Sequence, residues 1–169
     1  MIEVFPNTLR FDGRSYACAL GRAGIIARAD KREGDGATPE GIYPIRSVWY
    51  RPDRIALPPI AFSSFPITPA DGWCDDPGHP DYNRHVTLPF KASHERLWRD
   101  DGRYDILAVL GHNDDPAVPN LGSCIFWHIA AEDYAVTAGC VATKAEDLLS
   151  LLPLLSAQSE IHIHQAVSR

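Results

Sequence analysis

Hydrophobic and polar residues alternate along several short stretches in the first half of the chain, which is the pattern of half-buried β-strands. The stretches are residues 2–5 (IEVF), 8–11 (TLRF), 15–20 (SYACAL) and 41–50 (GIYPIRSVWY). Asp12 and Gly13 join the second stretch to the third. Because Asp-Gly adopts the positive φ angles of a two-residue hairpin turn, the pattern predicts an N-terminal β-hairpin.

Three further strands are predicted in the second half of the chain. Residues 104–113 (YDILAVLGHN) contain a continuous apolar run, which indicates a strand buried on both faces. Residues 123–129 (SCIFWHI) follow, and Cys124 and His128 fall on the same face of that strand because side chains alternate. Residues 160–164 (EIHIH) close the chain as a strand. The sequence therefore predicts a mainly β fold.

Residues 66–84 depart from the strand pattern. They are rich in Pro, Gly and Asp and show no period, which predicts a long irregular loop. Trp73 and Tyr82 lie within it, and aromatic side chains favour an ordered loop over a disordered one.

A helix is predicted near the C-terminal end. Thr143 and Glu146 fit a capping box, in which each side chain binds a free backbone amide of the first turn. The run AEDLLSLLPLL follows at residues 145–155, and we expect Pro153 to end or kink the helix.

Length and charge limit the classes of protein to consider. The 169 residues predict a single domain over residues 1–169, and 45% hydrophobic residues are enough for one core. The net charge of -6 argues against nucleic-acid binding. No apolar run is long enough to span a membrane, and MIEVFPNTLRFDG lacks the features of a secretory signal. We expect a monomer.

Four cysteines are present, at positions 18, 74, 124 and 140. None forms a C-x-x-C pair, so a structural zinc site is not expected, and a chain of this size does not need disulfides. No other spacing of His, Cys and acidic residues predicts a metal site. We expect three unreactive cysteines and one reactive one.

The segment FWHIAAEDYAVTAGCVAT, residues 126–143, contains the candidate chemistry. His128 ends a predicted strand, and Cys140 precedes the predicted helix. A cysteine attacks as its thiolate, which a neighbouring histidine can generate by accepting the thiol proton. The dipole at the N-terminus of the predicted helix would also lower the pKa of the thiol, by a smaller amount. The alternative is a turn with a buried small residue and an unrelated core histidine.

The residues before Cys140 suggest a second element of such a site. Gly139 permits a sharp turn and a close approach of substrate to the backbone. The amides from Ala138 to Cys140 could then form an oxyanion hole.

These residues resemble the YkuD-type L,D-transpeptidase catalytic domain. That family has a His at the end of a strand and then Ser/Thr-x-Gly-Cys, here His128 and Thr137-Ala138-Gly139-Cys140. A TPxG strand opening is its second mark, and TPEGIYPI stands at residues 38–45. The phrases GWCDDPGHPDYNR and ASHERLWR are similar to a shorter proteobacterial branch. The resemblance covers roughly residues 15–155.

The resemblance implies a β-sandwich with the cysteine in a cleft and one or more helices, including one directly after Cys140. It implies that His128 deprotonates Cys140, and that the backbone carbonyl of Ile129 orients the imidazole. The thiolate would attack an L-centre carbonyl of a peptidoglycan stem peptide, usually that of diaminopimelate. A D-amino acid would leave, and an amine would resolve the thioester. Neither a metal nor a cofactor is implied. A thiolate–imidazolium pair would keep Cys140 reactive below the pH at which a free thiol ionises.

The sequence departs from the family pattern at two positions. Ala138 stands where His is common, and Ala142 stands where Arg or Asn helps to hold substrate. We therefore expect another carboxylate anchor, and Arg84 in the long loop is the candidate because a guanidinium binds a carboxylate with two hydrogen bonds. The other candidate substrate-binding residues are Tyr82, Asn83, Trp73, His112 and Thr137. The alternative for these residues is loop packing, and for His112 a loop-capping role.

The function predicted from the resemblance is L,D-transpeptidation of peptidoglycan, with an atypical 1,3-type specificity suggested by the departures. The alternatives are an L,D-carboxypeptidase or amidase, in which water resolves the thioester, and an inactive peptidoglycan-binding module. The substrate implies the periplasm, while the lack of a secretory signal favours the cytoplasm as the alternative.

Overall fold

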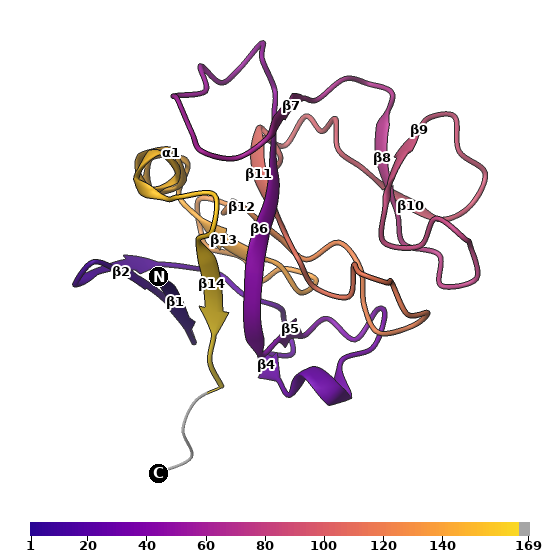
Figure 1. Cartoon of the computed structure of the whole chain (residues 1–169), viewed down its shortest axis with the longest axis horizontal. Coiled ribbons are helices and arrows are strands. Elements are labelled where there is room, and N and C mark those ends of the chain that lie inside the picture. Colours follow the sequence, from indigo (N-terminus) through magenta and orange to yellow (C-terminus); the bar gives the residue numbers. More distant parts are fainter. Residues whose placement is uncertain (166–169) are drawn as a thin grey trace.

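The computed structural model describes residues 1–165, which form a mainly β structure (Figure 1). The strands are β1 (Ile2–Phe5), β2 (Thr8–Phe11), β3 (Arg14–Ala17), β4 (Ile25–Ile26), β5 (Thr38–Pro39), β6 (Gly41–Tyr50), β7 (Ser64–Pro66), β8 (Asp71–Cys74), β9 (His85–Thr87), β10 (His94–Arg96), β11 (Ile106–Leu110), β12 (Phe126–Ile129), β13 (Val141–Thr143) and β14 (Glu160–Ile163). The helical segments are α1 (Ala145–Leu151), η1 (Arg28–Asp30) and η2 (Leu152–Leu154). Within the described residues, no helix is both long and apolar enough to cross a membrane.

The largest sheet has the strand order β13-β12-β11-β6-β14-β1-β2-β3, with β7 paired to β6. The predicted strands at residues 2–5, 8–11, 41–50 and 160–164 are all present in it. The predicted hairpin is confirmed as well: Asp12 and Gly13 have φ angles of 48° and 73°, and β2 pairs antiparallel with β3.

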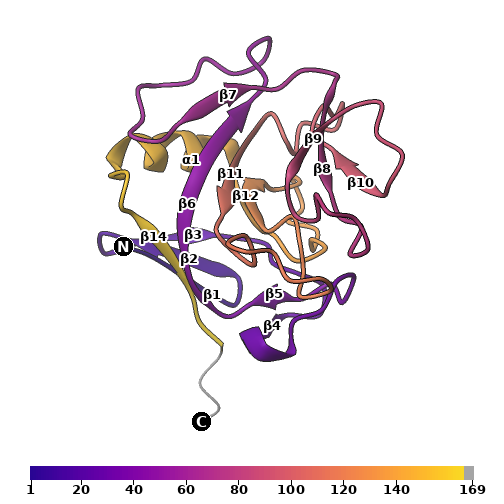
Figure 2. The same cartoon turned by 45° about the vertical axis from the view of Figure 1, so that its right-hand side comes forward.

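The centre of this sheet is buried on both faces. Side chains of β11 alternate between two hydrophobic clusters: Ile106 belongs to the cluster that contains Leu148 of α1, and Leu107 to the cluster that contains Trp73 of the second sheet. That second sheet has the order β10-β8-β9. It lies to the right of β6 in Figure 1, and α1 lies to the left. The three-stranded sheet and α1 are also separate in the turned view of Figure 2. The continuous apolar run of β11 is explained by these two coverings.

The segment 66–84 is ordered but not wholly irregular. Residues 71–74 form β8, the middle strand of the three-stranded sheet. Trp73 and Tyr82 are both buried, as expected for an ordered segment.

The predicted capping box at Thr143 is wrong. Thr143 lies in β13, where its Oγ1 accepts a hydrogen bond of 2.9 Å from the buried Trp127 indole. The helix begins at Ala145 after Lys144, which makes no side-chain cap. The three-residue strand β13 thus stands between Cys140 and the helix, which is the next helical segment along the chain after the cysteine. Pro153 lies in η2, just beyond the end of α1, as predicted.

Candidate active site

The backbone before Cys140 makes a turn that only glycine fits. Gly139 has a φ of +144°, and a Cβ at this position would stand 2.9 Å from the carbonyl oxygen of Ala37. Thr137 closes the turn: its Oγ1 donates to the carbonyl of Cys140 at 2.7 Å and accepts from the amide of Gly139 at 3.1 Å. The Thr-x-Gly-Cys sequence is therefore a structural unit that fixes the direction of the cysteine.

Residues on either side of the turn form backbone hydrogen bonds with the segment that follows β3. Ala142 exchanges two backbone hydrogen bonds with Ala19, of 2.8 and 2.9 Å, and the amide of Thr137 donates to Leu20 at 2.8 Å. On its other side, β13 pairs in parallel with β12. Cys140 is thus held between two neighbouring pieces of chain, which limits the movement of its thiol.

The Cys140 thiol is buried and hydrogen-bonded. Its Sγ donates to the carbonyl of Cys124 at 3.1 Å and accepts from the amide of Phe126 at 3.4 Å. Burial, reinforced by the negative charge of Glu95, raises the pKa of the Cys140 thiol to about 12. The resting side chain is consequently a neutral thiol.

His128 is held at one nitrogen and free at the other. Its Nδ1 lies 2.8 Å from the carbonyl oxygen of Ile129, the contact that the family resemblance implies. Because a carbonyl only accepts, Nδ1 carries the proton and Nε2 is left as a proton acceptor. The ring also packs edge-on against Tyr104, with centroids 5.1 Å apart. Burial lowers the pKa of His128 to about 4, so the imidazole is neutral at neutral pH.

Burial therefore disfavours a resting thiolate–imidazolium pair in this structure, because it raises the pKa of the Cys140 thiol and lowers that of His128. Burial penalises both charged forms, and the start of α1 lies beyond β13, too far along the chain for its dipole to lower the pKa of Cys140. The arrangement is a neutral thiol and a neutral imidazole that line one cavity.

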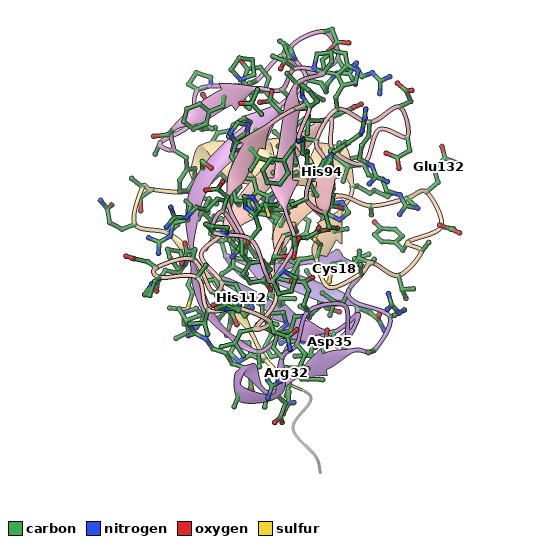
Figure 3. The ribbon with its side chains drawn as sticks, turned by 90° about the vertical axis from the view of Figure 1, so that its right-hand side faces the viewer. Cys18, Arg32, Asp35, His94, His112 and Glu132 are labelled. Atoms are coloured by element: carbon green, nitrogen blue, oxygen red, sulfur yellow. The ribbon has the colours of Figure 1, made fainter. Side chains whose placement is uncertain are left out.

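That cavity has a volume of about 460 Å³ and contains side chains of both charges. Among its lining residues are Arg22, Lys31, Arg99 and Arg103, and the acidic Glu33, Asp75 and Glu95. Cys140, His128, Cys124, Tyr104, Thr137 and Ala138 line it too. Figure 3 labels His94, another lining residue, well inside the outline of the molecule, while Glu132 of the β12–β13 loop stands at its edge. Among residues 1–165, no group of His, Cys, Asp and Glu stands where it could hold a metal ion.

Arg84 does not reach this cavity. It is exposed and lines a separate depression of about 220 Å³, together with Trp73 and His85. Trp73 is buried there against Phe126, edge to face at 5.4 Å. The proposed carboxylate anchor of the long loop therefore faces a different part of the surface from Cys140.

Three other predicted substrate-binding residues are packed inside the protein instead. Tyr82 is buried, and its hydroxyl donates to Glu33. Asn83 is buried, and its side chain makes four hydrogen bonds. His112 binds the carbonyl of Leu121 at 2.9 Å, and burial lowers its pKa to about 4. These side chains fix the loops around the cavity, which agrees with the packing alternative stated for them.

Sequence reasoning missed most of the charged residues of the cavity. Glu95 and Arg99 belong to ASHERLWR, a phrase whose sequence indicates only a family likeness. Arg103 and Tyr104 lie just before β11. The available signal was Glu95 beside His94 in a short polar segment. Nothing in that segment alone shows that β10 pairs with β8 and so brings Glu95 to the cavity.

A mainly β fold that presents a buried cysteine and a histidine with a free Nε2 in one cavity is the arrangement expected of a domain with a cysteine nucleophile. The family model for YkuD, the L,D-transpeptidase catalytic domain, matches residues 5–163. The chain belongs to this family, which acts on peptidoglycan peptides. The match is inconsistent with classing the chain as a hydrolase. Searches of curated proteins and of solved structures found no match.

Proposed function

We propose that this chain is an L,D-transpeptidase that forms a thioester between Cys140 and a diaminopimelate-containing stem peptide. The observation that carries the proposal is the state of His128. Its Nδ1 is fixed by Ile129, so its Nε2 can accept a proton in the cavity that also contains Cys140. A base that is neutral at working pH is what activation of a neutral thiol requires.

The first half of the reaction follows from these protonation states. The thiol of Cys140 gives its proton to His128 as the sulfur attacks the carbonyl carbon, and the imidazolium then protonates the departing D-amino acid. Because the amide of Gly139 is already bonded to Thr137, the oxyanion role falls to the neighbouring amides of Ala138 and Cys140. The carbonyl of Cys124 would release the thiol as this proton transfer occurs.

Arg103 is our candidate for binding a substrate carboxylate. It lines the cavity, and its backbone carbonyl accepts a hydrogen bond of 3.0 Å from the amide of Ile129. Its only ion pair within the described residues is a loose one, 3.9 Å from Asp101. Ala142, at the position where the family commonly keeps a basic or polar residue, is buried and pairs with Ala19. A different anchor supports an atypical cross-link, of the 1,3 type.

The experiment is incubation of the protein with purified muropeptides, followed by mass spectrometry of the products. Cross-linked dimers that disappear in Cys140→Ala and fall strongly in His128→Ala are expected, and fragmentation of the dimers reports the linkage. Products that are only shortened stems, or dimers that persist in Cys140→Ala, would contradict the proposal. The substrate also leads us to propose a periplasmic location, which fractionation of cells would test.

A further inference from the structure

One acidic side chain of the cavity is placed to act in the second half of the reaction. Glu95 belongs to β10, whose antiparallel pairing with β8 sets Glu95 opposite Trp73. Its Oε1 accepts a hydrogen bond of 2.7 Å from the hydroxyl of Tyr104. The ring of Tyr104 in turn packs against His128. Glu95 is therefore linked through one aromatic ring to the residue proposed as the base.

Glu95 lines the cavity, and its two oxygens accept fewer hydrogen bonds than a carboxylate can. Its contact with Arg99 is long, at 3.9 Å, because the guanidinium of Arg99 is mainly engaged by Asp101. Glu33, by contrast, accepts from both Tyr82 and Ser123. A carboxylate accepts more hydrogen bonds than Glu95 receives here, so it can still bind a cation.

The proposed reaction brings a cation to this place. An acceptor amine is mostly protonated at neutral pH and must become a free amine before it attacks the thioester. We infer that Glu95 binds the ammonium group of the acceptor stem peptide, a role that rests on the proposed function. The ammonium gives one proton to Glu95. Its second proton passes to His128 as the N–C bond forms and the C–S bond breaks. His128 then returns that proton to the sulfur of Cys140, and Glu95 releases its proton to solvent.

The surroundings of Glu95 support this role. Burial raises the pKa of its carboxyl group, which makes it a better proton acceptor than an exposed glutamate. The Tyr104 hydroxyl stays protonated, since burial raises its pKa well above the ordinary value. Tyr104 is thus a fixed donor to Oε1 of Glu95, and the Cys124 thiol is a weaker donor to the same carboxylate.

The test separates the two halves of the reaction. Acylation is followed by release of the D-amino acid and by the intact mass of the protein. The acyl-enzyme is then treated either with a stem peptide, whose amine is charged, or with hydroxylamine, which is uncharged at neutral pH. In Glu95→Gln, attack by the stem peptide should fall about ten- to a hundredfold more than acylation, the scale of a charged hydrogen bond. Attack by hydroxylamine should fall much less.

Two further variants make the result specific. Tyr104→Phe keeps the ring against His128 but removes the hydrogen bond to Glu95, and should show a smaller loss of the same kind. Glu132→Gln neutralises an exposed carboxylate of the β12–β13 loop that does not line the cavity, and should leave the preference between the two acceptors unchanged. Equal losses with both acceptors, or a loss in Glu132→Gln that matches Glu95→Gln, would overturn the inference. A wild-type protein that forms no acyl-enzyme would overturn the proposed function itself.

Discussion

At the scale of single residues, burial determines the protonation states of His128 and Cys140. The imidazole has a pKa of about 4 and the thiol a pKa of about 12, so both are neutral over the whole range between these values. In the proposed reaction, charge appears on the pair only when the proton moves from sulfur to Nε2. The proposed pair thus differs from a cysteine that rests as a thiolate.

These values predict an unusual pH profile. Since the base must be neutral, kcat/KM for the acylation step, followed as release of the D-amino acid, should stay level down to about pH 5 and fall as His128 becomes protonated near pH 4. Alkylation of Cys140 by iodoacetamide without substrate should be slow and should keep rising above pH 8.5, where a free thiol would level off. An acid limb near pH 6.5, or fast alkylation at neutral pH, would show that the pair rests in its charged form.

The two arginines named above provide a second residue-scale prediction. Arg103→Ala should lower kcat/KM for stem peptides by roughly ten- to a hundredfold, because a charged hydrogen bond to carboxylate is lost. Arg84→Ala should change it less than twofold, since Arg84 lines another depression. Steady-state kinetics on both variants decides between them. A large effect of Arg84→Ala beside a small one of Arg103→Ala would reverse the assignment.

At the scale of elements, the site depends on loops that are joined by side chains. Asn83 accepts hydrogen bonds from the Trp73 indole and the Cys124 amide, both at 3.1 Å. It donates to the carbonyls of His112 and Asn113 at 2.9 and 2.8 Å. One buried side chain thus connects the three-stranded sheet to the segment that carries Cys124, whose carbonyl binds the Cys140 thiol.

Asn83→Gly should therefore destabilise the protein while keeping its backbone conformation. Asn83 has a φ of +57°, which glycine adopts without strain, so the loss comes from buried partners left without hydrogen bonds, about 1–3 kcal/mol or more. Asn120→Gly is the matched control: its φ is +68°, it is exposed, and its side chain makes no hydrogen bond within residues 1–165. Urea unfolding should show a clear fall in midpoint for Asn83→Gly and almost none for Asn120→Gly. Equal midpoints would contradict the connecting role.

At the scale of the whole molecule, features that depend on neighbouring residues are predictable from the sequence, and features that depend on residues far apart in the chain are not. The hairpin at Asp12 and Gly13 was predictable because its signal lies within a few residues. The same holds for the Thr137–Cys140 turn, in which neighbours bond to one another. Thr143 was misassigned because a distant partner, the Trp127 indole, takes the hydroxyl that a helix cap would use.

The charged walls of the cavity illustrate the same limit. Glu95 and Tyr104 meet because a small second sheet covers one face of the large sheet, and that packing has no signature in either segment alone. Whether Arg84 or Arg103 faces Cys140 depends on how each segment packs, which charge and spacing do not reveal. His128 and Cys140 could be named in advance because the motif that contains them is short and contiguous.

The most direct test of the account is the intact mass of the protein after brief exposure to a stem peptide. Wild-type protein should gain the mass of the acyl group, and peptide mapping should place it on Cys140 with concomitant release of a D-amino acid. Cys140→Ala should gain nothing, while Cys18→Ala and Cys74→Ala should be acylated normally. Acylation that persists in Cys140→Ala, or its absence from wild-type protein that cross-links stems, would contradict a thioester mechanism at Cys140.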